Sequence, residues 1–355
     1  MNFTLNLIMT ENEQTSIPNG KAGLIEKIKA NARQTHLETE HGIGDDAAIA
    51  HYDGGESTLV STSIFAEGIH FDLTYTPLKH FGYKVVVAAA TKIVAMNATP
   101  IQMTIAFAVS NKVMQQHILE FYDGVHAACE EYDIDLIGGD ITTSRTGITV
   151  SVTTIGRADE SEIVMRSGAK PTDLLCVTGD LGAAYMGLQL LEREKSIFNA
   201  APSTQPKLQG YEYILRRQLK PELQAEVLKY LKTKQIKPTS MIAVSSGLAS
   251  EIINICRASN AGCEIFEERV PIASDTTKMA KEFNIAPIVA ALNGGEDYEL
   301  LFTIPLNTYE KIKDNDFFKV IGSINAPEQG TNIVMEDGAI MPLQPSLNQQ
   351  TLTNN

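Results

Sequence analysis

Three short stretches of the sequence combine glycine with acidic side chains in a way that could do chemistry. They are GIGDDAA near the start, GGDITTS at residues 138–144, and GGEDYELL near the end. Glycine lets the backbone turn sharply or lets a phosphate approach it closely, and carboxylate oxygens are the ligands that Mg²⁺ prefers. Each stretch alone is also typical of an ordinary turn. Together they predict an acidic metal-phosphate site.

The first stretch has the most complete set of oxygen ligands. Asp45 and Asp46 lie at the mouth of a predicted hairpin, whose second strand ends at Ser61, Thr62 and Ser63. Adjacent side chains of an extended chain point in opposite directions, so one carboxylate can face a ligand while the other orients the turn. Hydroxyls and carboxylates gathered in this way suit octahedral Mg²⁺.

The second and third stretches place an acid directly after two glycines. Asp140 follows Gly139 after an apolar run that reads as a buried strand ending in a turn, and Glu296 and Asp297 follow another glycine pair. A fourth stretch, MIAVSSGLASE, has the same strand-turn-helix build, but it carries Ser245 and Ser246 where a metal site would want an acid. The presence of serines instead of an acid at this turn therefore needs an explanation.

Other known phosphate and catalytic motifs are missing. There is no GxxxxGK[ST] phosphate loop, no HRD with DFG, and no GxGxxG with an acid about 20 residues on. TGDLGAA opens a helix that could bind an anion, which is a weak signal by itself. No Ser-His-Asp or Cys-His pairing is legible. Composition and spacing therefore indicate a possible Mg-phosphate site but do not identify the reaction.

The elements that would position these residues alternate between strands and helices. AAIAHYDGGESTLVSTSIF predicts a hairpin, TPLKHFGYKVVVAAATKIVAMNA a helix capped by Thr76, and IQMTIAFAV a half-buried strand. QQHILEFYDGVHAACEEYD predicts a second helix, and GITVSVTTIG another strand. Similar alternation in the second half predicts an α/β protein of α+β type, with two domains that are each a mixed sheet backed by helices.

Domain limits follow from length and composition. A chain of 355 residues is long for one core. We expect a disordered tail over residues 1–18, an α/β domain that binds ATP and metal over 19–165, a second α/β domain over 166–344, and a disordered tail over 345–355.

The bulk composition excludes several classes of function. A net charge of −14 argues against nucleic acid or an anionic membrane as the main partner. The N-terminal segment has no basic region and no long apolar core, and no run reaches membrane-spanning length. The four cysteines are scattered, which is typical of buried thiols in a reducing compartment. A cytoplasmic protein is the prediction.

Read in order, several blocks resemble the thiamine-monophosphate kinase family, which shares a superfamily with aminoimidazole-ribonucleotide synthetase. The blocks are GIGDDAA, AEGIHFDLTYTPLKHFGYK, AMNATP, LIGGD, RSGAKPTDLLCVTGDLGAA, GLASEI and GGEDYELLFT, and they extend over residues 20–343. The resemblance implies a homodimer of two-domain α/β subunits, paired through their N-terminal sheets. It also implies transfer of the γ-phosphoryl group of ATP to thiamine monophosphate with several Mg²⁺ ions and no covalent intermediate.

The resemblance also implies a role for individual residues. They are, as metal ligands, Asp45, Asp46, Ser61, Thr62, Ser63 and Asp140; as ATP contacts, Tyr122, Gly139, Asp140, Arg166 and Ser245; and as substrate contacts, His70 and Glu296. For His70 and Tyr122 the alternative is ordinary, partly buried packing.

Departures from the family pattern answer the question about the serines. Aspartates of the pattern are replaced by Ser63, Lys92, Ala243 and Ser246. Ser245-Ser246 therefore lies in a turn that carries metal ligands in the family. A hydroxyl cannot replace the charge of a carboxylate, so fewer Mg²⁺ ions, or none, are expected. The final segment also lacks the aromatic residue that the family tends to place near the substrate.

Lys92 lies on an otherwise apolar face of its predicted helix, which is costly for an ammonium group without a partner. We expect it to replace a lost Mg²⁺ and to pair with Asp45 or Asp140, or else to extend past the helix edge to solvent. Two functions stay open. One is an active thiamine-monophosphate kinase, and the other is an impaired or inactive relative that binds nucleotide or thiamine phosphate as a regulatory protein.

Overall fold

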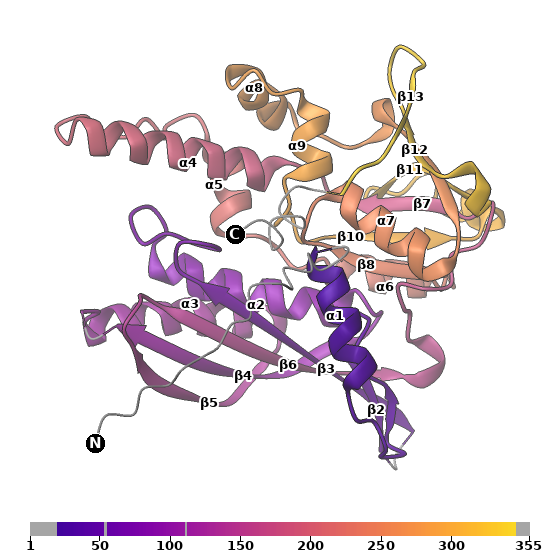
Figure 1. The fold of residues 1–355 in the computed structure, drawn as a ribbon, viewed down its shortest axis with the longest axis horizontal. Helices are drawn as coiled ribbons and strands as arrows, with labels where there is room; N and C mark the ends of the chain where they lie inside the picture. Colours follow the sequence, from indigo (N-terminus) through magenta and orange to yellow (C-terminus); the bar gives the residue numbers. More distant parts are fainter. Residues whose placement is uncertain (1–19, 53–54, 111, 346–355) are drawn as a thin grey trace, which may run out of the picture.

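The computed structural model describes residues 20–52, 55–110 and 112–345. The predicted disordered tails lie outside this part of the chain, except for residue 345. The described residues form two sheets that divide the sequence between them, joined by residues 160–173. Both sheets are mixed and both are covered by helices, so the predicted α/β class is confirmed (Figure 1).

The first sheet has six strands in the order β1-β2-β3-β6-β4-β5, and only β4 and β5 run parallel. Its elements are α1 (Gly20–Asn31), β1 (Thr39–His41), β2 (Ala48–His51), β3 (Glu56–Ala66), α2 (Leu78–Val94), β4 (Thr99–Ser110), α3 (Gln115–Tyr132), β5 (Asp135–Ser144), β6 (Thr149–Asp159) and the 3₁₀ turn η1 (Glu160–Glu162). The predicted hairpin is β2 with β3, paired antiparallel from Ala48 opposite Val60.

The second sheet has seven strands in the order β13-β12-β9-β11-β7-β10-β8. Its strands are β7 (Leu174–Thr178), β8 (Ser240–Val244), β9 (Gly262–Phe266), β10 (Glu299–Ile304), β11 (Phe318–Asn325), β12 (Thr331–Val334) and β13 (Ile340–Pro342). Its helices are α4 (Ala183–Ala200), α5 (Glu212–Leu219), α6 (Ala225–Thr233), α7 (Leu248–Ser259), α8 (Ser274–Glu282), α9 (Pro287–Asn293) and α10 (Tyr309–Ile312), with 3₁₀ turns η2 (Glu267–Arg269), η3 (Leu306–Thr308) and η4 (Pro327–Gln329).

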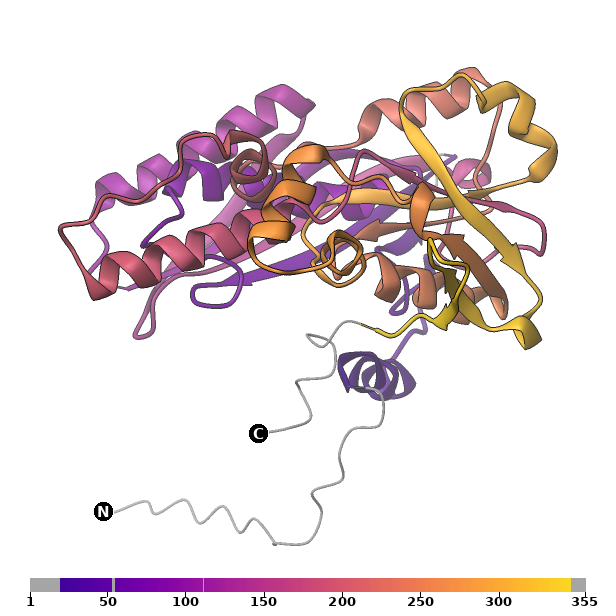
Figure 2. The same ribbon diagram turned by 90° about the horizontal axis from the view of Figure 1, so that it is seen from above.

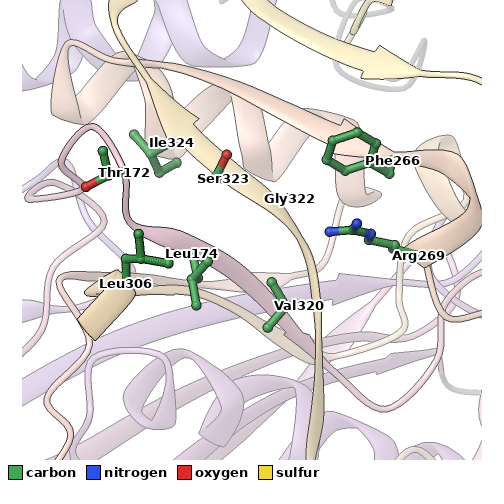
Figure 3. Close-up of a pocket in the computed structure, with 9 residues that line it drawn as sticks. All are labelled: Thr172, Leu174, Phe266, Arg269, Leu306, Val320, Gly322, Ser323 and Ile324. Atoms are coloured by element: carbon green, nitrogen blue, oxygen red, sulfur yellow. The ribbon is translucent and has the colours of Figure 1, made fainter. Parts of the chain in front are cut away.

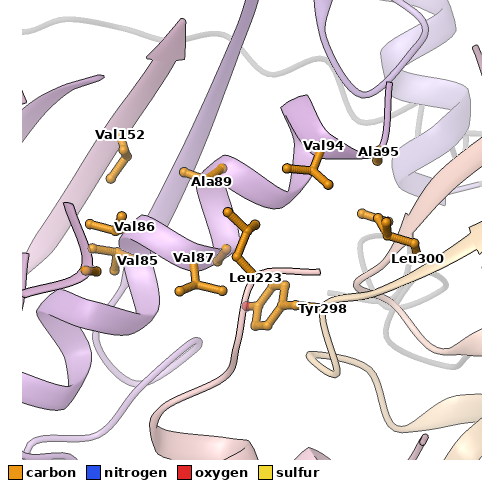
Figure 4. Packing of buried hydrophobic residues seen from close by; sticks show 14 of the residues in the cluster. Val85, Val86, Val87, Ala89, Val94, Ala95, Val152, Leu223, Tyr298 and Leu300 are labelled. Atoms are coloured by element: carbon orange, nitrogen blue, oxygen red, sulfur yellow. The ribbon is translucent and has the colours of Figure 1, made fainter. Parts of the chain in front are cut away.

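Helix α2 is the central element of the fold. Its run VVVAAA is apolar on all sides, because one side of the helix faces the first sheet and the other faces the second half of the chain. Figure 4 shows its valines and alanines between Val152 of β6 and Tyr298 and Leu300 of the second half. One hydrophobic cluster therefore extends across both halves. The predicted cap at Thr76 is wrong, because Pro77 takes the cap position and no side chain caps the helix.

Helices α2 and α3 lie in close contact because a glycine of each faces the backbone of the other. A Cβ atom on Gly82 would lie 1.9 Å from the Phe121 carbonyl oxygen, and one on Gly124 would lie 1.8 Å from the Lys79 carbonyl oxygen. The two helices cover one face of the first sheet. The opposite face, with Thr62 and Ile64 of β3, carries no helix within the described residues (Figure 1).

Helix α1 behaves differently from the rest of the first half. Its side chains are exposed along most of its length, including the apolar Leu24, Ile25 and Ile28, and Figure 2 shows it standing apart from the body of the molecule. Its end nevertheless lies over the GIGDD loop, since a Cβ atom on Gly44 would lie 2.7 Å from Lys29 Nζ. In the part of the chain that the structure describes, no helix is long and apolar enough to cross a membrane.

Candidate functional site

A charged cluster forms where the GIGDD loop, the last turn of α2, residue 166 and the β8–α7 turn meet. We use the name charged cluster for Asp45, Asp46, Lys92, Arg166, Ser245, Ser246 and Glu251. The cluster lies at the junction between the two halves, because Val164 still bonds to the carbonyl oxygen of Met96 while the carbonyl oxygen of Met165 accepts a bond from Met241.

Arg166 holds the acidic pair. Its backbone nitrogen donates to Asp45 Oδ2 at 3.1 Å, and its Nε donates to Asp45 Oδ1 at 3.3 Å. Its Nη2 lies 3.5 Å from Asp46 Oδ2. The Asp45 side chain is only 2% exposed, so this pairing is largely screened from water. Arg166, predicted as an ATP contact, thus contacts the predicted metal ligands.

Asp46 is the member of the pair whose charge is less well stabilised. Its Oδ2 is buried without a hydrogen bond, and burial raises the pKa of Asp46 to about 7, with Asp45 and Glu251 also raising it and Arg166 and Lys92 lowering it. The backbone carbonyl of Asp46 accepts a bond from Ser61 Oγ at 2.8 Å. The second strand of the hairpin therefore does reach the acidic pair, as the sequence predicts.

Lys92 lies beside the same loop. Its ammonium group donates to the Thr62 carbonyl oxygen at 3.2 Å, and its charge lowers the pKa of Asp46. Lys92 thus acts on Asp46, which is next to Asp45, the partner that the sequence predicts. Ser63, predicted as a further ligand on this strand, has a buried hydroxyl oxygen without a hydrogen bond.

The serine turn is held by Glu251, which our sequence analysis missed. Its Oε1 accepts from Ser245 Oγ at 3.3 Å and from the Ser246 backbone nitrogen at 3.0 Å. Glu251 is 3% exposed and lies in the first turn of α7. The signal was present in the block GLASEI, as an acid placed shortly after a strand-to-helix turn. Ala243 is buried in β8 and belongs to the core.

The GGEDY stretch packs against the serine turn from the other side. The Glu296 backbone nitrogen donates to the Ser245 carbonyl oxygen at 2.9 Å, and Glu296 and Tyr298 both have positive φ angles, of 59° and 53°. Non-glycine residues rarely adopt this conformation, and strain of this kind gathers at functional sites. Asp297 serves the fold, because it accepts bonds from the backbone nitrogens of Gly182 and Ala184 at the start of α4.

Glu296 forms an ion pair with a lysine that sequence analysis also missed. Lys84 Nζ lies 2.9 Å from Glu296 Oε2 and donates to the Gln218 carbonyl oxygen at 2.8 Å. Lys84 is 4% exposed on α2, two turns before Lys92. The sequence signal that could have found Lys84 is a second lysine, besides Lys92, on an apolar face of this helix.

The loop with His70 extends to Tyr75, whose pKa is raised by burial, by Glu192 and also by Asp72 and Glu296. His70 Nδ1 accepts the backbone N–H of Ala66 at 3.1 Å, so Nε2 carries the ring proton of the neutral imidazole. Asp72 of this loop bonds to Lys195 Nζ at 2.7 Å, and the Tyr75 hydroxyl donates to Glu192 Oε1 at 2.6 Å. Both partners lie on α4, so the second half of the chain anchors the loop.

Three predicted residues lie elsewhere. Gly139 and Asp140 are on β5, and Tyr122 is on α3 beside Phe107, with ring centroids 6.4 Å apart. The prediction that GGD forms a turn at the end of a buried strand is wrong, because β5 continues through these residues to Ser144 as a largely exposed edge strand. An edge strand of this kind pairs with a neighbour on one side only, and its side chains can be exposed to solvent.

Asp140 therefore does not join the charged cluster within one chain. The strand register places Asp140 level with Ala106, Ser151 and Ile64, on the sheet face opposite α2 and α3. Strands β6 and β4 separate β5 from the β2–β3 hairpin that follows the GIGDD loop. The predicted site between the GDD hairpin, the GGD stretch and Ser245-Ser246 is thus two separate groups in a single subunit.

A surface pocket of about 390 Å³ lies away from all of these residues. It is lined by apolar side chains such as Leu174 and Val320, with Phe266 and Arg269 at one side (Figure 3). No predicted site residue contributes to its lining.

Comparison with known proteins agrees with the arrangement of these elements. Residues 44–158 match the family described as AIR synthase related protein, N-terminal domain. Thiamine-monophosphate kinase of Bacillus subtilis is 33% identical over 278 residues, which cover 78% of this chain and 82% of that protein. The enzyme of the same name from Aquifex aeolicus is 28% identical, with coverage of 91% and 96%.

A solved structure described as AaThiL complexed with AMPPCP and TMP superposes with a TM-score of 0.79 at 28% identity. The superposition covers 92% of this chain and 96% of that one. The match thus includes both sheets and the junction between them. The chain belongs to the thiamine-monophosphate kinase family.

Proposed function

We propose that this protein transfers the γ-phosphoryl group of ATP to thiamine monophosphate, giving thiamine diphosphate and ADP. The observation that carries the proposal is the similarity, over nearly the whole chain, to a structure that holds a nucleotide analogue and TMP. A phosphate oxygen of thiamine monophosphate would attack the γ-phosphorus while its bond to the β-phosphate oxygen breaks. Positioning and charge would carry this chemistry.

The charged cluster suits the nucleotide phosphates. Arg166 and Lys92 bring two positive charges to the GIGDD loop, and Arg166 is also close enough to Glu251 of α7 for that carboxylate to raise its pKa. Arginine binds phosphate through a planar fork and lysine as a compact charge. Ser245 lies in the turn before this helix. We assign Arg166 and Ser245 to ATP.

The Lys84–Glu296 pair and the His70 loop suit the second substrate. Glu296 offers a carboxylate to the cationic thiazolium part of thiamine monophosphate, while His70 Nε2 can donate to an oxygen of its phosphate. This loop is anchored to α4, which would hold the acceptor in one place relative to ATP. We assign His70 and Glu296 to the substrate.

Asp140, Gly139 and Tyr122 enter this proposal through a second subunit. The uncovered sheet face includes Ile64, which is 64% exposed, and Asp140 lies on the same face. An exposed apolar sheet face is a typical surface for association. A homodimer through this face would move Asp140 from the outside of one subunit to the interface, where it could act with Mg²⁺ brought by ATP.

A second function is favoured by the state of the metal-ligand positions. The oxygens of Asp45 and Thr62 already accept bonds from arginine and lysine, and Ser63, Lys92, Ala243 and Ser246 offer no carboxylate. A protein that binds ATP and thiamine monophosphate without turnover would fit this pattern.

One experiment decides between the two functions. Purified protein with ATP, thiamine monophosphate and excess Mg²⁺ is assayed for thiamine diphosphate, beside a variant that combines Ser63→Asp, Lys92→Asp, Ala243→Asp and Ser246→Asp. Turnover on the order of 1 s⁻¹ by the natural chain supports the kinase. Binding of both ligands without product, together with activity in the variant, supports the binding protein. Failure to bind either ligand would overturn both functions.

A further inference from the structure

Three of the residues that the sequence singles out for a resident Mg²⁺, Asp45, Asp46 and Thr62, lie against cationic side chains. Both carboxylate oxygens of Asp45 accept bonds from Arg166, and the Thr62 carbonyl oxygen accepts a bond from Lys92. Asp46 Oδ2, a buried oxygen without a hydrogen bond, lies 3.5 Å from the Arg166 guanidinium group. A metal ion at any of these oxygens would therefore lie beside a cationic side chain that repels it.

The donor set also fails a direct test for a resident metal. Across the described residues, no group of three or more His, Cys, Asp or Glu side chains is placed to hold a metal ion. Ser61 Oγ donates its proton to the Asp46 carbonyl oxygen. Mg²⁺ demands near-octahedral oxygen coordination and loses its water reluctantly, so a site with few available oxygens holds it weakly.

The charges of the cluster are nearly balanced without a metal. Asp45, Asp46 and Glu251 carry up to three negative charges, and Arg166 and Lys92 carry two positive ones. A divalent ion would leave the cluster with a positive excess in a partly buried place, beside two cations that repel it. An aspartate at residue 92 would make the net charge of the cluster more negative by two units, and the cluster would then favour binding of a cation.

We propose that Lys92 and Arg166 are built-in cations that take the place of a resident Mg²⁺, so that this site binds the nucleotide phosphates through side-chain charge. The inference rests on the proposed function, since it takes ATP as the ligand. Lys92 is fixed by Thr62, and Arg166 by Asp45, so both charges are held in position before the ligand arrives. Any metal needed for turnover then enters as part of Mg·ATP.

Binding of a non-hydrolysable ATP analogue by calorimetry, in EDTA and in excess Mg²⁺, tests this inference. The natural protein is expected to bind with dissociation constants that differ by less than about threefold between the two conditions. Lys92→Asp is expected to lose at least tenfold in affinity in EDTA, equivalent to about 1.4 kcal/mol, and to recover it in Mg²⁺. Lys92→Met, which removes the charge alone, should weaken binding in both conditions.

The matched control is Lys79→Asp, which makes the same charge change at an exposed position of the same helix and should behave as the natural protein. Binding of Mn²⁺ alone, followed by electron paramagnetic resonance, gives a readout that does not depend on nucleotide. Lys92→Asp combined with Ser63→Asp should bind Mn²⁺ more tightly than the natural protein.

Two outcomes would overturn the inference, and they differ in what else they affect. If the natural protein binds the analogue more than tenfold tighter with Mg²⁺ and Lys92→Asp changes nothing, the inference is wrong while the proposed function stands. If no variant binds the analogue in either condition, the proposed function is lost as well.

Discussion

Glu299 shows how single residues in this protein combine structure with charge. It is a fully buried glutamate at the start of the apolar strand ELLFTI. Its carboxylate accepts from Arg217 Nη2 at 2.7 Å and from Thr178 Oγ1 at 2.5 Å. A buried charge is tolerated only when it is paired and hydrogen-bonded. This pair therefore fixes α5 to the second sheet, next to the GGEDY stretch.

Arg217→Met should destabilise the protein by about 3–5 kcal/mol, because it leaves Glu299 buried without its partner. The free energy of unfolding in urea measures this. Arg216→Met is the control, since Arg216 pairs with Glu222 at the surface and both side chains are 55% exposed. Exposed pairs contribute about 0–1 kcal/mol. Equal losses in the two variants would contradict our view of the Arg217–Glu299 pair.

Asp297 should make stability depend on pH. Burial raises the pKa of Asp297 to about 7 from an ordinary 3.8, although Arg217 and two backbone N–H groups lower it. The folded state therefore binds this proton more tightly than the unfolded state. The resulting stabilisation is complete below about pH 4 and is lost as pH rises through about 7.

Accordingly, the free energy of unfolding should fall between pH 4 and 7, by at most about 1.4 kcal/mol per pH unit from this group. Asp297→Asn removes the titration and should make the fall shallower. Asp123→Asn, on the exposed face of α3, should keep the natural slope. An unchanged slope in Asp297→Asn would show that this carboxyl group does not titrate in that range.

At the scale of elements, close contacts between backbones decide where the candidate site residues lie. Strand β5 runs beside β4 so tightly that a Cβ atom on Gly139 would lie 2.0 Å from the Ile105 carbonyl oxygen. The neighbouring Gly138 has room, since its nearest contact would be 3.9 Å away at Thr104. The two glycines of GGD thus have different roles, although the sequence presents them as a pair.

Gly139→Ala should push β5 away from β4 and destabilise the protein by about 1–3 kcal/mol, as overpacking does. Gly138→Ala should be within about 1 kcal/mol of the natural protein, because the added methyl group contacts no backbone atom. Thermal unfolding of the two variants gives the comparison. A Gly139→Ala protein as stable as Gly138→Ala would mean that β5 shifts without cost.

At the scale of the whole molecule, α2 and α3 cover one face of the first sheet, and among the described residues no helix covers the other. This asymmetry is what the proposed homodimer explains. Ile64 lies on the uncovered face and is 64% exposed, and Ile340 on β13 is 63% exposed in the other sheet. The two residues therefore allow a matched test of which surface associates.

Ile64→Glu should dissociate the dimer, because a buried carboxylate without a partner is costly at an interface. Light scattering after size exclusion should show the mass of the variant falling from two chains to one. Ile340→Glu should leave the mass unchanged. A natural protein that is already a monomer of 38.7 kDa would refute the homodimer.

Residue types and their order determined the family and much of the secondary structure of this protein. The alternation of apolar runs predicted the hairpin, α2, β4, α3 and β6, because hydrophobic periodicity follows directly from which side of an element is buried. The blocks from GIGDDAA to GGEDYELLFT indicated the family from residue types alone. The replacement of expected carboxylates by Ser63 and Lys92 was also legible, since it depends only on residue identity.

Tertiary structure alone decided how these residues combine. Sequence could not show that Arg166 would hold Asp45 or that Lys84 would pair with Glu296, because each contact joins residues far apart in the chain. Nor could it place Asp140 on the opposite sheet face. The sign and spacing of charges in a site depend on packing between distant elements, whereas periodicity and motif are local properties of the chain.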